Sequence, residues 1–221
     1  TCSASRNCVS FWAVSNMEEQ RKSENALVPA LRFEGFSDPW EQRKLGDVAR
    51  ELSTGKSVNS LDGRGGNSDV CILKTSCVSG NTFDPNERKQ VVESEQDIAQ
   101  CPVEKDTVIV SRMNTPELVG CCGYCASDLG NLFLPDRLWK VTLEGFVDPY
   151  FIYTLLASAT YQARLKSTAT GTSGSMKNIA QPSFLDLNIP VTKSDEQQRI
   201  GFLFRKLDSL IALHQRERAG V

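Results

Sequence analysis

The 221-residue sequence contains one histidine, His214, and its formal net charge is only −2. No apolar run approaches the roughly 18 residues that a membrane-spanning helix needs. The small net charge argues against a histone-like polycation, although a local basic face can still bind phosphates. No motif links His214 to a serine or cysteine nucleophile, which disfavours a general-base role for it. These shortages argue against a membrane protein, a polycation and a histidine-dependent enzyme.

The sequence does have enough apolar material for a core. Apolar residues make up 40% of it and charged residues 24%, which is typical of one soluble domain with appendages. Residues 1–16 lack the basic and sustained apolar stretches of a signal peptide, and the first methionine is Met17. We therefore expect a cytoplasmic protein in which residues 1–30 are a flexible N-terminal segment.

Eight cysteines raise the question of a metal or redox site. The stretch "GCCGYCAS" contains a C-x-x-C motif, Cys122 and Cys125, beside Cys121, and such a motif can bind zinc or undergo redox cycling. A tetrahedral zinc site needs a second pair of ligands, which the sequence does not offer at a suitable spacing. Three further cysteines lie in or beside apolar segments: Cys71, Cys77 and Cys101. We expect these cysteines to be small packing residues and no metal site, and a zinc or redox protein remains the alternative.

The first half of the chain predicts a helix, a loop and then strands. In "SDPWEQRKLGDVAREL", residues 37–52, Asp38 and Pro39 resemble a helix start, and an apolar stripe follows. Residues 53–68 are rich in glycine, serine and asparagine and predict a loop, in which Lys56 and Arg64 could contact a ligand. Between residues 69 and 143, short apolar runs separated by turn residues predict a compact mixed or antiparallel sheet.

The second half returns to helical spacing. Asp148 and Pro149 predict a helix start, and apolar residues then recur at helical intervals up to about Leu165. This helix should cover one face of the sheet. The run "FLDLNIP" predicts one more strand, ended by Pro190. The fold class expected is α+β, a compact mixed sheet with flanking helices followed by a long C-terminal helix.

That last helix is the clearest element. Ser194 and Gln197 have the spacing of a capping box. Five residues recur at alternating steps of three and four, as in a coiled-coil seam: Ile200, Leu203, Leu207, Leu210 and His214. Residues 195–218 would extend about 36 Å as a helix. Phe204 and Ile211 widen the stripe, so packing of this helix on its own domain remains the alternative to pairing with a second helix.

Five ordered stretches resemble the specificity subunit of bacterial type I restriction-modification systems: "WEQRKLGDV", "VIVSRMNTPELVG", "NLFLPDRLWKV", "GTSGSMKNIAQPSFLDLNIP" and "DEQQRIGFLFRKLDSLIALHQR". The resemblance implies DNA target-recognition domains, each followed by a spacer helix, with the two helices paired as an antiparallel coiled coil. It also implies a non-catalytic subunit. Methylation and cleavage, with S-adenosylmethionine, ATP and Mg²⁺, would belong to methyltransferase and restriction subunits.

This chain departs from the usual plan of that family. It offers one recognition domain, residues 31–193, and one spacer helix, residues 194–221. Three alternatives stay open: a half-size subunit that works as a homodimer, a truncated gene product, or one module of a pair encoded separately. A homodimer through the helix would make the bipartite DNA target palindromic. The cysteines of "GCCGYCAS" are not a feature of the resemblance. A coiled-coil adaptor without DNA binding stays open as a further alternative.

Two segments have the chemistry that DNA recognition needs, which is phosphate contacts for position and hydrogen bonds to base edges for sequence. Residues 167–184, "STATGTSGSMKNIAQPSF", combine hydroxyls, one cation and amides, and the candidates are Thr172, Ser173, Ser175, Lys177, Asn178 and Gln181. In "SRMNTPELVG", Arg112 and Asn114 follow a strand and suit guanine and adenine. Lys74 and Arg137 are candidate phosphate contacts. The alternatives are a flexible loop and a turn shaped by Asn114, with Arg112 paired to Glu117.

Overall fold

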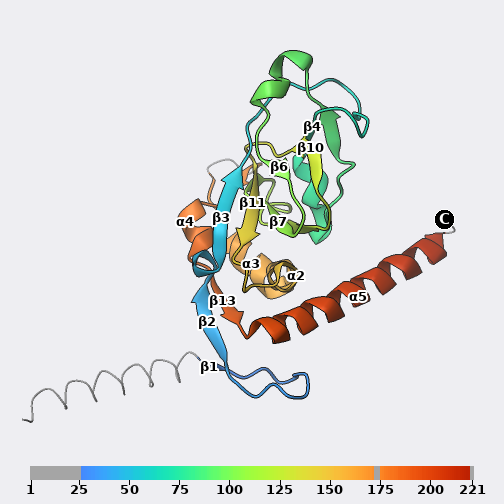
Figure 1. Cartoon of the computed structure of the whole chain (residues 1–221). Coiled ribbons are helices and arrows are strands. Elements are labelled where there is room, and N and C mark those ends of the chain that lie inside the picture. Colours follow the sequence, from blue (N-terminus) through green and yellow to red (C-terminus); the bar gives the residue numbers. More distant parts are fainter. Residues whose placement is uncertain (1–25, 172–174, 220–221) are drawn as a thin grey trace, which may run out of the picture.

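The structure is a computed structural model that describes residues 26–171 and 175–219. Its centre is a four-stranded antiparallel sheet in the order β3-β11-β7-β9, and a long helix leaves the body below it (Figure 1). The strands are β3 (Ala49–Thr54), β11 (Leu138–Leu143), β7 (Thr107–Ser111) and β9 (Cys122–Cys125). The α+β fold class with a long C-terminal helix is confirmed.

The middle strand β7 is buried along its whole length because both faces of the sheet are covered. Side chains alternate between the faces of a strand. Val108 and Val110 therefore belong to the core cluster under helices α2 (Pro149–Ala157) and α3 (Ala159–Thr168), whereas Ile109 belongs to a second cluster on the other face. The expected covering of one sheet face by the helical segment after Asp148 is confirmed.

A second four-stranded sheet, in the order β5-β4-β10-β6, lies over that second cluster. Its strands are β4 (Cys71–Leu73), β5 (Arg88–Gln90), β6 (Pro102–Val103) and β10 (Leu129–Phe133), and β4 pairs with β10 in parallel. Two 3₁₀ segments, η2 (Thr75–Asn81) and η3 (Glu93–Ile98), connect its strands. The strand segments predicted between residues 69 and 143 are confirmed.

The helix predicted from Asp148 to about Leu165 begins as expected but is divided in two. The Asp148 carboxylate accepts a hydrogen bond from the Phe151 amide at 2.7 Å, as an N-cap residue does. The helix is interrupted at Ser158, whose extended backbone ends α2. The Ser158 hydroxyl then accepts a hydrogen bond from the Tyr161 amide, which caps the start of α3. Serine competes for backbone hydrogen bonds, which explains the break.

The helix predicted over residues 37–52 is wrong. This segment forms β2 (Trp40–Lys44), a 3₁₀ turn η1 (Leu45–Asp47) and β3. Strand β2 pairs with β1 (Ala26–Leu27) on one side and with β13 (Asn188–Val191) on the other. Asp38 forms an ion pair with Lys193 at 2.5 Å. Strand pairing with distant segments therefore outweighs the local helix signal.

The strand predicted over "FLDLNIP" is shorter and later than expected. Its first residues belong to a short helix, α4 (Gln181–Leu185), and only β13 is extended. Pro190 lies inside β13 and does not end it. Strand β13 is the edge of its sheet, in the order β1-β2-β13, and proline is tolerated on an edge strand because its missing N–H can face away from the neighbour.

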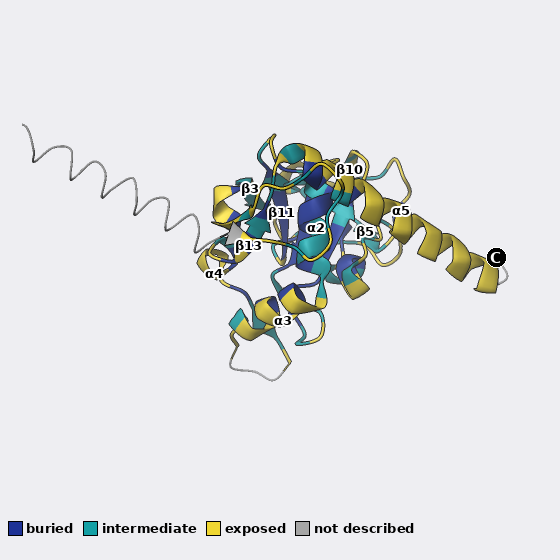
Figure 2. Ribbon diagram, turned by 90° about the horizontal axis from the view of Figure 1, so that it is seen from below, coloured by how far each residue is buried: buried dark blue, intermediate teal, exposed yellow. Residues whose placement is uncertain are grey.

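Helix α5 (Ser194–Ala219) begins at the residue predicted for it but is held differently. The Gln197 side chain forms no capping box. It accepts from the Asp148 amide at 3.0 Å and donates to the Thr192 carbonyl at 2.6 Å. The neighbouring Glu196 carboxylate is almost fully buried and binds the Arg32 guanidinium at 2.8 and 2.7 Å. In Figure 2, α2 is buried or half-buried, whereas α5 is exposed beyond its first residues.

The Glu196 ion pair generates a prediction. Burial acts to raise the pKa of this carboxyl, but the bonds from Arg32 and Thr192 and the Arg32 charge hold it below its usual value. We expect Glu196→Ala to lower the free energy of unfolding by about 1–3 kcal/mol at pH 7, because the half-buried Arg32 guanidinium loses its carboxylate partner. A carboxyl whose pKa is depressed in the folded state contributes stability at pH values above its ordinary pKa, which is near 4.3. The difference in stability between the parent chain and Glu196→Ala should therefore shrink as the pH falls below that value.

Denaturant unfolding at pH 7 and at acidic pH measures this. The control is Asp186→Asn, which removes an exposed ion pair with Lys44 and should change stability by less than about 1 kcal/mol. An equal effect of the two variants, or one independent of pH, would contradict the assignment.

Candidate nucleic-acid interface

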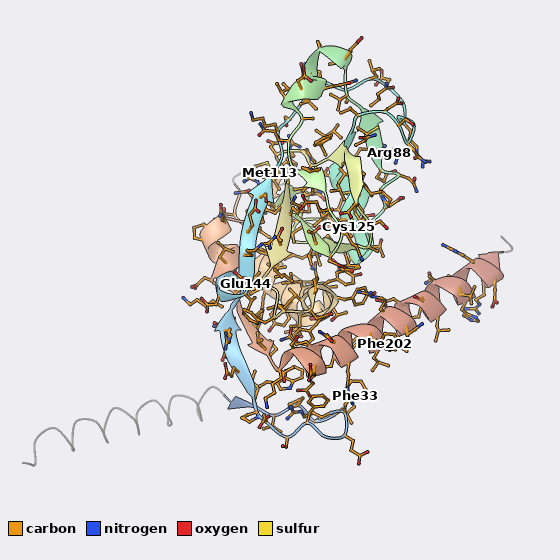
Figure 3. All side chains as sticks on the ribbon, in the orientation of Figure 1. Phe33, Arg88, Met113, Cys125, Glu144 and Phe202 are labelled. Carbon is orange, nitrogen blue, oxygen red and sulfur yellow. The ribbon has the colours of Figure 1, made fainter. Side chains whose placement is uncertain are left out.

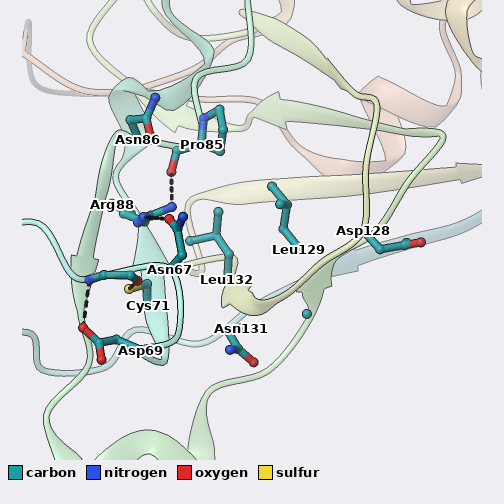
Figure 4. A pocket seen from close by; sticks show the side chains of 12 residues that line it. Asn67, Asp69, Cys71, Pro85, Asn86, Arg88, Asp128, Leu129, Asn131 and Leu132 are labelled. Atoms are coloured by element: carbon teal, nitrogen blue, oxygen red, sulfur yellow. Dashed lines mark hydrogen bonds between the residues drawn. The ribbon is translucent and has the colours of Figure 1, made fainter.

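The register of the central sheet gathers cationic residues at one end. Strand β7 ends at Ser111 opposite Leu138, where β11 begins, and β3 ends at Thr54 opposite Trp139. The residues just beyond these strand ends include Lys56, Arg112 and Arg137. The Arg112 amide donates to the Arg137 carbonyl at 3.1 Å, so these two residues are neighbours. Figure 3 labels Met113 at this end of the sheet and Glu144 at the opposite end.

A two-stranded ribbon adds the second predicted segment to the same place. Strand β8 (Met113–Asn114) pairs with β12 (Lys177–Asn178), and Lys177 lies opposite Asn114. The Ile179 amide also donates to the Arg112 carbonyl at 2.9 Å. The two segments predicted to contact DNA, which are far apart in the sequence, are therefore side by side. We name the group Lys56, Arg112, Arg137 and Lys177 the basic edge.

Arg112 is the best-positioned member of the basic edge. Its guanidinium stacks over the Trp139 ring at 5.8 Å, and its Nε is buried without a hydrogen-bond partner. Among the described residues no ion pair joins it to Glu117, the partner proposed in the turn alternative. Stacking on an aromatic face orients the planar guanidinium while leaving its terminal nitrogens to bind a ligand. Sequence reasoning missed the supporting role of Trp139, which is indistinguishable there from an ordinary strand residue.

Asn114 has a structural role. Its side chain is buried, and its amide donates to Ser111 Oγ at 3.1 Å and to the Thr75 carbonyl at 3.4 Å. Its Oδ1 accepts from the Thr115 amide at 2.9 Å. These bonds use both ends of the amide, so the geometry favours the turn-shaping alternative over contact with an adenine.

Residues 170–178, within the predicted segment 167–184, form a hairpin closed by two backbone hydrogen bonds between Thr170 and Asn178, at 2.7 and 2.8 Å. Lys177 is half-buried, and its ammonium lies 3.4 Å from the Gly171 carbonyl. The Asn178 Oδ1 is buried without a partner. Ser175 and Gln181 are exposed. The candidates Thr172 and Ser173 lie outside the described residues.

The remaining cation candidates differ in their surroundings. Lys74 lies 3.5 Å from the Glu87 carboxylate, which offsets its charge and fits the solvated alternative. Lys56 and Arg137 are exposed, and neither forms an ion pair within the part of the chain that the structure describes. The loop that carries Lys56 is held to the start of β11, because Ser57 donates to the Asp136 carboxylate at 2.6 Å.

The six cysteines that the structure describes lie in or against the two core clusters, five of them buried and Cys101 half-buried, as predicted for packing residues. Cys122 and Cys125 are both buried, but Cys122 packs in the cluster under α2 whereas Cys125 packs in the cluster on the other face of the sheet. Residues three apart in a strand point to opposite faces, so the C-x-x-C motif cannot close around one ion. Burial raises the pKa of both thiols. Within residues 26–171 and 175–219, no group of three or more metal-binding side chains comes together.

The seam of α5 faces away from the body. Leu203 and Leu207 are each 43% exposed and Leu210 is 62% exposed. Only Ile200 packs partly against the core, and His214 lies 3.9 Å from the Glu217 carboxylate on the helix surface. The alternative in which this edge packs on its own domain is therefore contradicted. None of the helices in the described ranges combines the length and apolarity that crossing a bilayer requires.

The packing role of Cys122 can be tested by two substitutions. Cys122→Ser should destabilise the fold by about 1–3 kcal/mol because it buries an unpaired hydroxyl, and Cys122→Ala should cost less. Unfolding curves and metal analysis of the purified chain measure this. Stoichiometric zinc in the parent protein, lost equally in both variants, would instead show a metal site.

The sequence was compared with family models, and the structure with solved structures. The sequence model of the type I restriction modification DNA specificity domain matches residues 37–221. The chain is similar in structure to the type I restriction-modification S subunit from M. genitalium, with a TM-score of 0.58 and 17% identity over 87% of this chain and 46% of that one. The HsdS subunit from Thermoanaerobacter tengcongensis gives a TM-score of 0.54 and 14% identity over 95% and 47% of the two chains.

A third similar structure comes from work on complex assembly and conformational transition of the type I R-M system, with a TM-score of 0.57 and 14% identity over 96% and 51% of the two chains. No curated protein sequence matches. The chain thus spans about half the length of the solved chains that share its fold. Because the family match extends over most of the sequence, the chain belongs to the family of type I restriction-modification DNA specificity domains.

Proposed function

We propose that the chain recognises a specific double-stranded DNA sequence and directs partner methyltransferase and nuclease subunits to a bipartite target. The observation that carries the proposal is the basic edge, where cations from four separate segments meet at one end of the central sheet. None of these four cations forms an ion pair with another described residue. Such cations suit a duplex even on a chain with a net charge of −2, because phosphate contacts supply much of the affinity for DNA.

Different members of the basic edge are suited to different parts of the duplex. Lys177 and Lys56 carry point charges, which suit phosphates. Arg112 presents a planar fork held on Trp139, and such a fork can bind O6 and N7 of guanine at the same time. In this proposal Lys177 fixes the position of the protein on the duplex and Arg112 reads a base.

Residues 31–193 form the recognition domain in this proposal, and residues 194–221 form the spacer. The exposed leucine edge of α5 pairs with the same edge of a second copy, which buries it. Two-fold symmetry then gives a target with two inverted half-sites. Methylation and cleavage, with S-adenosylmethionine, ATP and Mg²⁺, belong to the partner subunits, and this chain supplies recognition and spacing.

The two DNA roles predict different effects of substitution. We expect Lys177→Ala to weaken binding to all duplexes by a similar factor. It should also reduce the slope of the logarithm of the binding constant against the logarithm of the salt concentration by about one. We expect Arg112→Ala to relax preference at one base pair at a cost of about 1–3 kcal/mol. Binding to the selected target and to random duplex, measured over a range of salt concentrations, checks both.

The control is Lys105→Ala, which removes an exposed lysine next to the start of β7, at the other end of the sheet. It should bind like the parent chain. The assignment of Arg112 as a base reader fails if Arg112→Ala weakens specific and random binding to the same extent.

Pairing of α5 predicts a loss of assembly on changing its seam. Leu207→Asp places a charge in the apolar interface and should abolish self-association, since an unpaired buried charge is strongly unfavourable. Sedimentation velocity measures the assembly. Ser209→Asp adds the same charge to the same helix outside the seam, and it should leave the sedimentation profile unchanged. A Leu207→Asp chain that sediments like the parent would exclude this interface.

A further inference from the structure

Helix α5 is attached to the body at two places. The first is its beginning, where Gln197 bonds to Asp148 and where a side chain at Gly201 would meet the Asp148 carboxylate at 2.4 Å. The second lies one to two turns further on, where Arg205 and Asp208 meet two tyrosines of the body. One attachment would leave the helix free to pivot, whereas two attachments fix its direction.

The second attachment is an aromatic and ionic cluster that we name the Arg205 clamp: Tyr124 of β9, Tyr150 of α2, and Arg205 and Asp208 of α5. The Arg205 guanidinium lies 5.1 Å from the Tyr124 ring centre and 4.8 Å from that of Tyr150. Its Nη2 donates to the Tyr124 hydroxyl at 3.1 Å. Tyr150 donates to the Asp208 carboxylate at 2.6 Å.

The tyrosines of the clamp are themselves fixed. Their rings meet edge to face, with centres 4.9 Å apart, and Tyr124 donates to the Asp106 carboxylate. Burial, followed by the bond to Asp208, raises the pKa of the Tyr150 hydroxyl, which therefore remains a donor at neutral pH. The exposed Arg205 guanidinium thus contacts two tyrosines that are each hydrogen-bonded to a carboxylate.

Beyond Asp208, no hydrogen bond, ion pair or aromatic contact among the described residues joins α5 to the body. Figure 1 shows this part of the helix standing clear. The eleven residues from 209 to 219 extend about 16 Å. A tilt of about 10° at the clamp would therefore move the far end by about 3 Å, close to the rise of about 3.4 Å per base pair of DNA.

We infer that the Arg205 clamp sets the angle between α5 and the recognition body, and with it the number of base pairs between the two half-sites. This inference rests on the proposed function. Arg205, Tyr124, Tyr150 and Asp208 are positioning residues. They contact no base, and they change which spacing of half-sites fits both bodies at once.

The test first selects duplexes from a randomised pool with the full chain, in complex with its methyltransferase partner where assembly needs it. The spacer between the half-sites of the selected target is then lengthened or shortened one base pair at a time. Arg205→Ala removes the cation, and Tyr150→Phe removes only the bond to Asp208. Arg216→Ala is the matched control, because it removes an exposed arginine of the same helix beyond the clamp. Nitroxide probes at Lys105 and Glu217, both exposed, measure the helix angle without DNA.

We expect the parent chain and Arg216→Ala to prefer one spacer length and to give a narrow distance distribution. Arg205→Ala should reduce the preference over the adjacent spacer lengths by about threefold or more and broaden the distances, with a smaller effect of Tyr150→Phe. Unchanged spacer preference and unchanged distances in both variants would overturn the inference and leave the proposed function intact. Selection of no sequence by the parent chain would overturn the proposed function, while the probe distances would still report on the clamp.

Discussion

The structure depends on the way helix α5 is docked, by its polar face and not by its apolar one. Glu196, Gln197, Arg205 and Asp208 make its polar contacts to the body, and of the seam only Ile200 packs partly against the core. Leu203, Leu207 and Leu210 stay exposed. Fully burying one leucine side chain is worth about 1.5–3 kcal/mol, so an exposed edge of this kind is a strong attraction for a second surface. A helix attached through its leucines would have no such edge to offer. The polar attachment therefore leaves the leucine edge exposed for the pairing that we propose.

In the basic edge, strand pairing brings together cations that are far apart in the sequence. Arg137 and Arg112 are neighbours because β11 begins where β7 ends, and Lys177 joins them because β12 pairs with β8. The edge lies at the end of the sheet labelled by Met113 in Figure 3, and α5 leaves from the region beyond the other end. In the proposed function, a body that binds DNA at one end and is fixed to the spacer helix at the other transmits the angle of that helix to the duplex, provided the body is rigid. Strand β7, buried along its whole length, runs between the two ends, and close-packed interiors of this kind transmit strain.

Local patterns predicted those parts of the molecule whose causes are local. Asp148 caps α2, the apolar runs between residues 69 and 143 form strands, and α5 begins at Ser194. The failures have non-local causes. Residues 40–44 pair with β1 and β13, and the sequence around them gives no signal of this pairing. Asn114 matches a base reader in type, but its burial depends on Ser111 and Thr75 around it. Trp139 under Arg112 and the tyrosines around Arg205 come from distant segments, so only the folded chain shows them.

The central claim is that a basic edge reads DNA while an exposed helix edge joins two such readers. The most direct measurement is the pattern of methylated bases in the genome of a host that carries this chain with its partner methyltransferase. The account predicts one modified sequence made of two short inverted half-sites separated by a fixed number of unspecified base pairs. Methylation without any sequence preference, or at a single uninterrupted site, would contradict it.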